Sequence, residues 1–149
     1  MRFSEAKKHK VVSTATAQTV GTVHAFVVDP AARAVTALQL RKTEDGDTLR
    51  WADIAGFGAD AVMVDSTDRI TAAGDDVAAL TGKDHHLLGK RVLSTVGLEL
   101  GVVADVEFDA TSGALTGLVL RDGEVLRAPL VGVGSYAVVV RAEQASGTG

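Results

Sequence analysis

Apolar residues occur along this chain in short runs that are rich in valine and bounded by glycine, proline and aspartate. Several of these runs alternate with polar residues at every second position, which is the period of a β-strand. Many short strands separated by regular turns are typical of a β-sandwich or β-barrel. The predicted strands are 11–14, 22–29, 34–41, 49–51, 61–64 and 136–140.

Turn signals separate these runs. Asp29-Pro30 lies between two predicted strands. Asp45-Gly46 and Asp122-Gly123 each lie between apolar runs, and Asp-Gly pairs favour two-residue hairpins of type I′, in which both central residues have positive φ. We therefore predict hairpins at both pairs.

The chain repeats itself at a spacing of roughly eighty residues, which is too long for a solenoid repeat and suits a duplicated small domain. The gaps in the match fall where loops are expected. The matching segments are 11–14 with 92–95, 21–41 with 101–121, 49–50 with 126–127, and 58–64 with 134–140.

The repeat predicts the organisation of the chain. Within the connector, 75–80 is expected to form one or two helical turns between two glycines, and the small polar tail is expected to be flexible. The predicted units are a first repeat at 5–65, a connector at 66–88, a second repeat at 89–142 and a tail at 143–149.

Both repeats resemble the PRC-barrel family. The segments that carry the resemblance are 88–93, 101–109 and 113–120 in the second half, and 21–29, 35–40 and 51–54 in the first.

This resemblance implies an all-β fold of two small tandem PRC-barrel-like barrels, packed together and joined by a short irregular or part-helical connector. It also implies a protein-docking role without enzyme chemistry. Family members include a cytoplasmic domain of the photosynthetic reaction centre H subunit and the C-terminal domain of a 16S rRNA maturation factor. His24-Ala25 stands where the second half carries Asp105, which argues against a function that needs two equivalent barrels.

Composition and charge argue against several classes of function. The net charge of −4 and an aromatic content of 4% argue against a nucleic-acid partner, which usually selects a basic face and stacking rings. The absence of cysteine excludes disulfides and thiolate chemistry. The N-terminal ten residues lack the apolar core of a secretory signal, and no apolar run suggests a membrane span. We expect a cytoplasmic protein, and the alanine, valine and glycine content is typical of bacterial sequences.

Four groups of residues are candidates for binding. Alternation places Asp105, Glu107 and Asp109 on one strand face, opposite Val102, Ala104, Val106 and Phe108. This acidic face is a docking surface for a basic partner, a weak divalent-cation site or a solvated outer face. Trp51, the single tryptophan, is either an exposed anchor or a plug at the barrel end.

The third group is apolar. Val23, Ala25 and Val27 occupy the position of the acidic face in the first half, and we expect them to pack on the other barrel or on another subunit. Six basic residues at the openings of the repeats form either a patch for RNA or an acidic partner, or solvated strand starts. They are Arg2, Lys7, Lys8, Lys10, Lys90 and Arg91.

Catalytic motifs are missing from the sequence. No nucleophile elbow or phosphate-binding loop is present, and the adjacent His85 and His86 diverge in any regular structure. We expect no catalytic residue, cofactor or metal. The predicted function is a non-enzymatic adaptor that binds another protein, with association into homo-oligomers as an open option. The alternatives are an accessory factor in RNA or ribosome maturation and a small-ligand binder at the crevice between the barrels.

Overall fold

The computed structural model describes residues 1–44, 46–82 and 85–142. Strands hold 49% of the chain and helices 11%, in two sheets, which confirms the predicted all-β fold of two barrel-like units. The predicted tail 143–149 and Asp45 of one predicted turn lie outside the described residues. No helix in the described ranges is long and apolar enough to cross a membrane.

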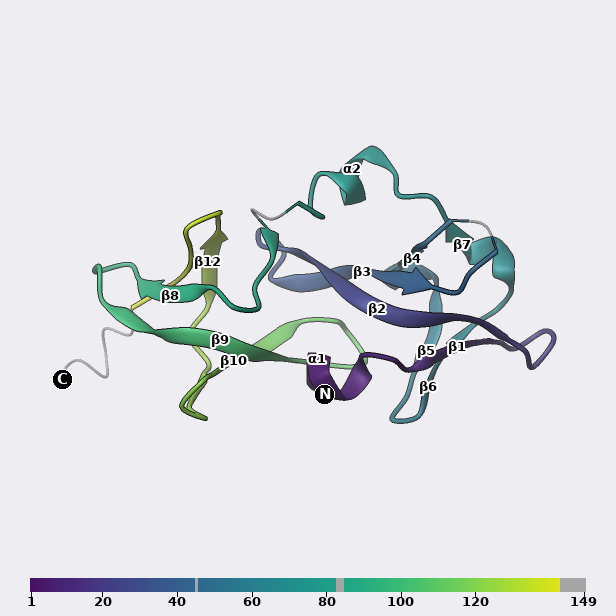
Figure 1. The fold of residues 1–149 in the computed structure, drawn as a ribbon, viewed down its shortest axis with the longest axis horizontal. Helices are drawn as coiled ribbons and strands as arrows, with labels where there is room; N and C mark the ends of the chain where they lie inside the picture. Colours follow the sequence, from purple (N-terminus) through teal and green to yellow (C-terminus); the bar gives the residue numbers. More distant parts are fainter. Residues whose placement is uncertain (45, 83–84, 143–149) are drawn as a thin grey trace.

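The two halves lie side by side, with the connector running over the first (Figure 1). The first half consists of α1 (Phe3–Ala6), β1 (Lys10–Ser13), β2 (Thr19–Asp29), β3 (Ala34–Arg41), β4 (Thr48–Arg50), the 3-10 turn η1 (Trp51–Asp53), β5 (Ile54–Phe57) and β6 (Ala61–Val64). The connector holds η2 (Thr67–Arg69), β7 (Ile70–Thr71) and α2 (Asp75–Ala78). The second half consists of β8 (Arg91–Ser94), β9 (Glu99–Phe108), β10 (Leu115–Leu120), β11 (Val125–Leu126), β12 (Leu130–Val133) and β13 (Ala137–Val140).

Both sheets have the same strand order. The first reads β5-β6-β1-β2-β3-β4-β7, and the second, from the matching end, reads β12-β13-β8-β9-β10-β11. In each half the first and last strands pair in parallel, β1 with β6 and β8 with β13, while the other neighbours are antiparallel. The connector strand β7 extends the first sheet alone. This common topology is what a duplicated unit requires.

β-Bulges repeat as well, and they change which side chains share a face. In β2, the register passes from Val23 opposite Leu40 to Ala25 opposite Gln39, so His24 is an extra residue. Ala104 of β9 occupies the same place in the second half. A bulge shifts the alternation of side chains by one position, which a strict period of two does not anticipate.

The predicted faces of β2 and β9 are therefore partly wrong. Val23 points into the main core, away from Ala25 and Val27, and not with them as predicted. In β9, Val103 joins Val106 in that core instead of lying on the acidic face. Asp105 and Glu107 do share the outer face.

The halves meet at the tips of their long hairpins. Ala34 and Ala114, at equivalent positions, form an isolated antiparallel bridge. The N–H of Val35 donates to the carbonyl oxygen of Gly113 at 2.8 Å, and the equivalent bond from β10 to the β2–β3 turn is 2.9 Å long. Because the same positions contact each other from both sides, the two halves are related by an approximate two-fold axis.

Aromatic rings join the halves into one core. Phe108 of β9 lies with its ring centroid 5.6 Å from Phe26 and 5.5 Å from Phe57, both of the first half. Phe3 stacks on Phe26 at 4.1 Å, and Trp51 meets Phe108 edge to face at 6.1 Å. Such pairs contribute roughly 0.5–1.5 kcal/mol each beyond the area they bury.

The Asp122-Gly123 hairpin forms, but its turn type differs from the prediction. Gly123 has a φ of +92°, whereas Asp122 is not among the residues of positive φ, so the turn is not type I′. The N–H of Gly123 donates to the carbonyl oxygen of Leu120 at 2.9 Å, and the N–H of Leu120 donates to the carbonyl oxygen of Glu124 at 2.8 Å. This is the longer hairpin loop, built on a type I turn with glycine in the left-handed position.

The connector helix α2 covers the outer face of the first sheet. Val77 is buried against Val27 and Ala37 in a small cluster separate from the main core. Arg50 of β4 holds the helix through both Nη atoms, each 2.8 Å from an oxygen of Asp76. The hydrogen bonds from Arg50 lower the pKa of Asp76 to about 2.

Replacing Arg50 with glutamine is expected to return the pKa of Asp76 toward its ordinary value of 3.8. In the unaltered protein the folded pKa of Asp76 lies below its unfolded pKa. The stabilisation that the Arg50–Asp76 pair gives the folded state is therefore complete above about pH 4 and is lost as the pH falls through about 2. An NMR titration of the Asp76 carboxyl carbon measures the shift. Arg69→Gln, which removes a different ion pair, is the control and leaves this pKa unchanged. An unaltered Asp76 titration in Arg50→Gln would contradict the assignment.

Candidate functional site

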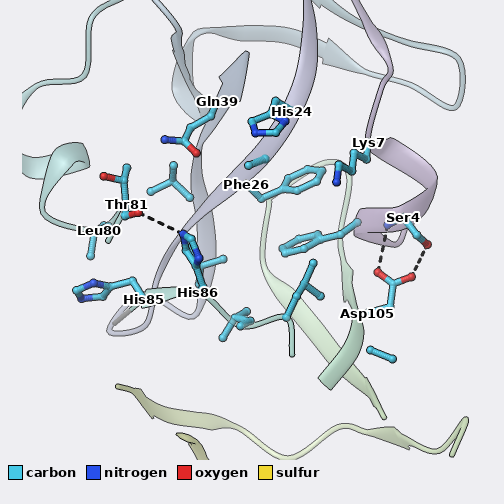
Figure 2. Close-up of a pocket in the computed structure, with 17 residues that line it drawn as sticks. Ser4, Lys7, His24, Phe26, Gln39, Leu80, Thr81, His85, His86 and Asp105 are labelled. Carbon is cyan, nitrogen blue, oxygen red and sulfur yellow. Dashed lines mark hydrogen bonds between the residues drawn. The ribbon is translucent and has the colours of Figure 1, made fainter. Parts of the chain in front are cut away.

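A pocket of about 420 Å³ opens between the two halves (Figure 2). Its lining comes from α1, β2, the end of the connector and β9, which are far apart in the sequence. Phe3 and Leu87 contribute buried apolar surface, and Phe26 packs beside them. The walls are therefore mainly apolar, as in most small-molecule sites.

One side of this pocket carries positive charge. Lys7 and His24 flank Phe26 in Figure 2, and Gln39 lies close by. Nη2 of Arg41 lies 3.1 Å from Nε2 of His24. Burial lowers the pKa of His24, and the charges of Arg41 and Lys7 lower it further. Because a guanidinium can only donate hydrogen bonds, Nε2 of His24 is the acceptor in this contact.

The opposite side is formed by the connector. Nε2 of His86 lies 3.2 Å from the carbonyl oxygen of Thr81 and donates to it. Nδ1 of His85 is buried and has no hydrogen-bond partner within the described residues. The sequence assigned no role to this histidine pair, and in the structure both residues line the pocket.

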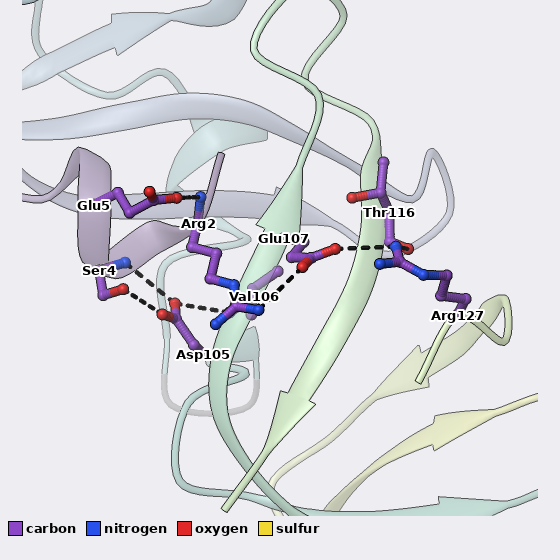
Figure 3. Close-up of polar contacts among 8 residues, drawn as sticks. All are labelled: Arg2, Ser4, Glu5, Asp105, Val106, Glu107, Thr116 and Arg127. Carbon is purple, nitrogen blue, oxygen red and sulfur yellow. Dashed lines mark hydrogen bonds and ion pairs between the residues drawn. The ribbon is translucent and has the colours of Figure 1, made fainter. Parts of the chain in front are cut away.

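The predicted acidic face of β9 contacts the N-terminal segment of the same chain (Figure 3). Asp105 accepts from the backbone N–H of Ser4 at 3.1 Å, from the Ser4 hydroxyl, and from the N–H of Val106 at 2.9 Å. Glu107 pairs with Arg2 at 3.3 Å and with Arg127 at 2.9 Å. A role for these carboxylates in binding a partner stays a prediction, and in this structure their hydrogen bonds lie within the chain.

Asp109 and Trp51 also have contacts within the chain. Asp109 begins the β9–β10 turn and accepts from the N–H groups of Thr111 at 2.7 Å and Ser112 at 3.1 Å, which lower its pKa. Trp51 is half-buried and lies against Phe57, Phe108 and the position of Gly113. These contacts place Trp51 at the junction between the halves rather than at a barrel end.

The apolar trio predicted as an interface is divided among three environments. Val23 lies in the main core, Ala25 lines the pocket between the halves, and Val27 lies beneath α2 and also lines that pocket. Ala25 and Val27 therefore both line the pocket at the boundary between the barrels, whereas Val23 does not.

Exposed large apolar side chains gather in the second half. Among the described residues, they are Leu88 (50% exposed), Val96 (69%), Leu98 (62%), Val131 (46%) and Tyr136 (66%). Sequence reasoning missed them because scattered exposed apolar residues are ordinary in soluble proteins.

Comparison of the two repeats supplies the missing signal. The backbone N–H of Ser13 donates to the carbonyl oxygen of Gln18 at 3.0 Å, and the N–H of the equivalent Ser94 donates to that of Leu98 at 2.8 Å. Leu98 therefore corresponds to Gln18. Tyr136 directly precedes the last strand, where the first half has Asp60. At both positions the second half replaces a polar side chain by a large apolar one.

Basic residues at the two repeat openings do not act as one free patch. Arg2 pairs with Glu107, Arg91 pairs with Glu99 at 3.3 Å, and Nζ of Lys90 lies 2.6 Å from the carbonyl oxygen of Gly134. Within the residues that the structure describes, no group of three or more histidine or acidic side chains is arranged to hold a metal ion.

Two comparisons with known proteins bear on the chain. Residues 82–144 match the family model of the PRC-barrel domain, which covers the whole of the second sheet. No curated protein matches the sequence. The first half, with the same strand order and the same bulges, lies outside the matched range.

Proposed function

Since residues 82–144 match the family model of the PRC-barrel domain, we propose that the protein is a non-enzymatic module that docks another protein on the outer surface of this second half. The observation that carries the proposal is the difference between the repeats. The same fold occurs twice, and the exposed large apolar side chains of the described residues all belong to one copy or to Leu88 just before it. A requirement of the fold alone would place them in both.

Tyr136 and Arg91 are the strongest anchors on this surface. Arg91 lies over the Tyr136 ring, with its guanidinium carbon 4.7 Å from the ring centroid, and donates to the phenol oxygen at 3.1 Å. The pair is therefore held in one arrangement before a partner arrives, which reduces the entropy lost on binding. Tyrosine and arginine are enriched among residues that dominate binding energy at interfaces.

The β8–β9 turn offers a second contact. Val96 and Leu98 extend from it into solvent, and the turn is fixed because the N–H groups of both residues lie 3.3 Å from Oγ of Ser94. Apolar side chains on a rigid turn bury area without ordering a flexible loop. These two contacts favour a partner with a largely apolar docking face.

Giving the second half the residues of the first is expected to abolish partner binding. In the double variant Leu98→Gln and Tyr136→Asp, retention of the native partner should fall at least about tenfold, because truncating an interface anchor costs roughly 2 kcal/mol or more. The measurement is quantitative mass spectrometry of proteins that co-purify with the tagged full chain from its native cell extract.

The matched control alters the same positions of the other repeat, Gln18→Ala with Asp60→Asn, and should retain the partner. The proposal is wrong if the double variant retains the same proteins as the unaltered chain. If RNA co-purifies instead and is released by moderate salt, the role in RNA maturation takes its place. Sedimentation equilibrium separately shows whether the partner is a second copy of this chain.

A further inference from the structure

We infer that the pocket between the two halves binds a small carboxylic acid with an apolar body. This inference does not depend on the proposed docking surface: Leu88 belongs to both, but the docking anchors Val96, Leu98 and Tyr136 lie outside the pocket lining. The inference rests on the size and lining of the pocket, the charge at its mouth, and a difference between the repeats at this one place.

The pocket has the dimensions of a ligand site. Its volume of about 420 Å³ lies within the range of roughly 300–1,000 Å³ that is usual for small-molecule pockets. Phe3 and Phe26 form a stacked pair along it, and Leu80 and Leu87 contribute aliphatic surface from the connector. An aliphatic chain or an aromatic ring placed here would lose contact with water at little steric cost.

The charge at the mouth selects an anion. Lys7 lines the pocket, and Arg41 reaches it through its contact with His24. Asp105 is the single acidic side chain among the described lining residues, and its oxygens accept from Ser4 and Val106 rather than from a cation. Lys7 and Arg41 together bring two positive charges against this one carboxylate, and Lys7 has no ion-pair partner among the described residues.

His24 reports this positive field. Burial lowers its pKa most, and the charges of Arg41, which contacts it at 3.1 Å, and of Lys7, which lines the same pocket, lower it further. A carboxylate beside Lys7 would offset that field. Occupation by an acid is therefore expected to raise the pKa of His24, whereas a neutral ligand would leave the field in place.

The two repeats differ at this site. The backbone N–H of Lys8 donates to the carbonyl oxygen of Val23 at 2.8 Å, and in the second half the N–H of Gly89 donates to that of Val103 at 2.9 Å. The residues that precede these two donors, Lys7 and Leu88, are therefore equivalent. Both line the pocket. One repeat therefore supplies a cation and the other an apolar side chain, which together match the two parts of an amphipathic acid.

Binding can be tested with simple probes on the full chain. Octanoate, octan-1-ol, octylammonium and acetate are titrated separately and followed by backbone amide NMR shifts. Octanoate is expected to shift the amides of Ala25, Phe26 and Leu87, to bind at least about tenfold more tightly than octan-1-ol, and to raise the pKa of His24. Octylammonium and acetate should bind more weakly still.

Variants separate the contributions of charge and space. Lys7→Gln alters an exposed side chain and should weaken octanoate about fivefold or more while leaving octan-1-ol unchanged. Lys10→Gln, a nearby exposed lysine outside the pocket lining, should leave both unchanged. Ala25→Leu fills the pocket and should reduce binding of both probes.

The inference is overturned if none of the probes shifts these amides. It is equally overturned if octanoate and octan-1-ol bind alike, or if Lys7→Gln has no more effect than Lys10→Gln. None of these three outcomes bears on the docking surface, because Leu98 and Tyr136, the residues tested there, are outside the pocket lining.

Discussion

Replacing Phe108 with alanine is expected to destabilise the protein by about 3–5 kcal/mol, the usual cost of removing a buried phenylalanine ring. Phe108 is 1% exposed and belongs to the second half, yet it contacts Phe3, Phe26, Phe57 and Trp51 of the first. Loss of the ring removes the side chain on which four other rings converge. Both halves should therefore lose stability together.

Urea denaturation followed by tryptophan fluorescence measures this effect. Trp51 is the single tryptophan, and its ring centroid lies 6.1 Å from that of Phe108, so its emission reports on the affected region. Val96→Ala, at a side chain 69% exposed, is the control and should change the free energy of unfolding by less than about 0.5 kcal/mol. A loss below about 1 kcal/mol for Phe108→Ala would contradict a shared core.

Replacing Gly113 with alanine is expected to cost about 2–4 kcal/mol. Gly113 has a φ of +81°, and a Cβ there would lie 2.9 Å from Cε2 of Trp51 and 3.0 Å from the backbone oxygen of Val35. The left-handed backbone alone costs a side chain about 1–2 kcal/mol. The remainder comes from the contact with Trp51 and with a backbone atom that is itself part of the junction.

Gly89→Ala isolates the conformational part of that cost. Gly89 has nearly the same φ, +83°, but no atom lies within 4 Å of its added Cβ. It should therefore lose only about 1–2 kcal/mol, measured in the same urea titrations. If the two variants are equally stable, the close approach of the halves at Gly113 is not as described.

The duplication and the all-β fold were predictable because they depend on local pattern. Alternating valines and Asp-Gly turns are visible along the chain, and the repeat places the same pattern twice. The bulges at His24 and Ala104 were not predictable, because an extra residue in one strand is revealed only by the pairing of its neighbour. Side chains that follow a bulge, such as Asp105 and Glu107, share a face as predicted. Side chains on opposite sides of a bulge, such as Val23 and Ala25, were predicted to share a face and do not.

The candidate sites were less accessible to sequence reasoning than the fold. The outer face of Asp105 and Glu107 was found, but its contacts with Arg2 and Ser4 join residues about a hundred positions apart. The pocket likewise combines Lys7, Ala25 and Leu87 from separate segments. Alternation within one strand carries no information about which distant segment lies on it, so these arrangements required the tertiary structure.

The position of the N-terminal segment affects how the protein reaches its native state during translation. The carbonyl of Met1 bonds to Phe108 at 2.8 Å, and Ser4 contacts a residue 101 positions later. At synthesis rates of about 5–20 residues per second, these residues are made roughly 5–20 s before their binding face. During that interval the Phe3 ring lacks most of its native neighbours. The nascent first half is thus expected to remain dependent on chaperones until the second has emerged.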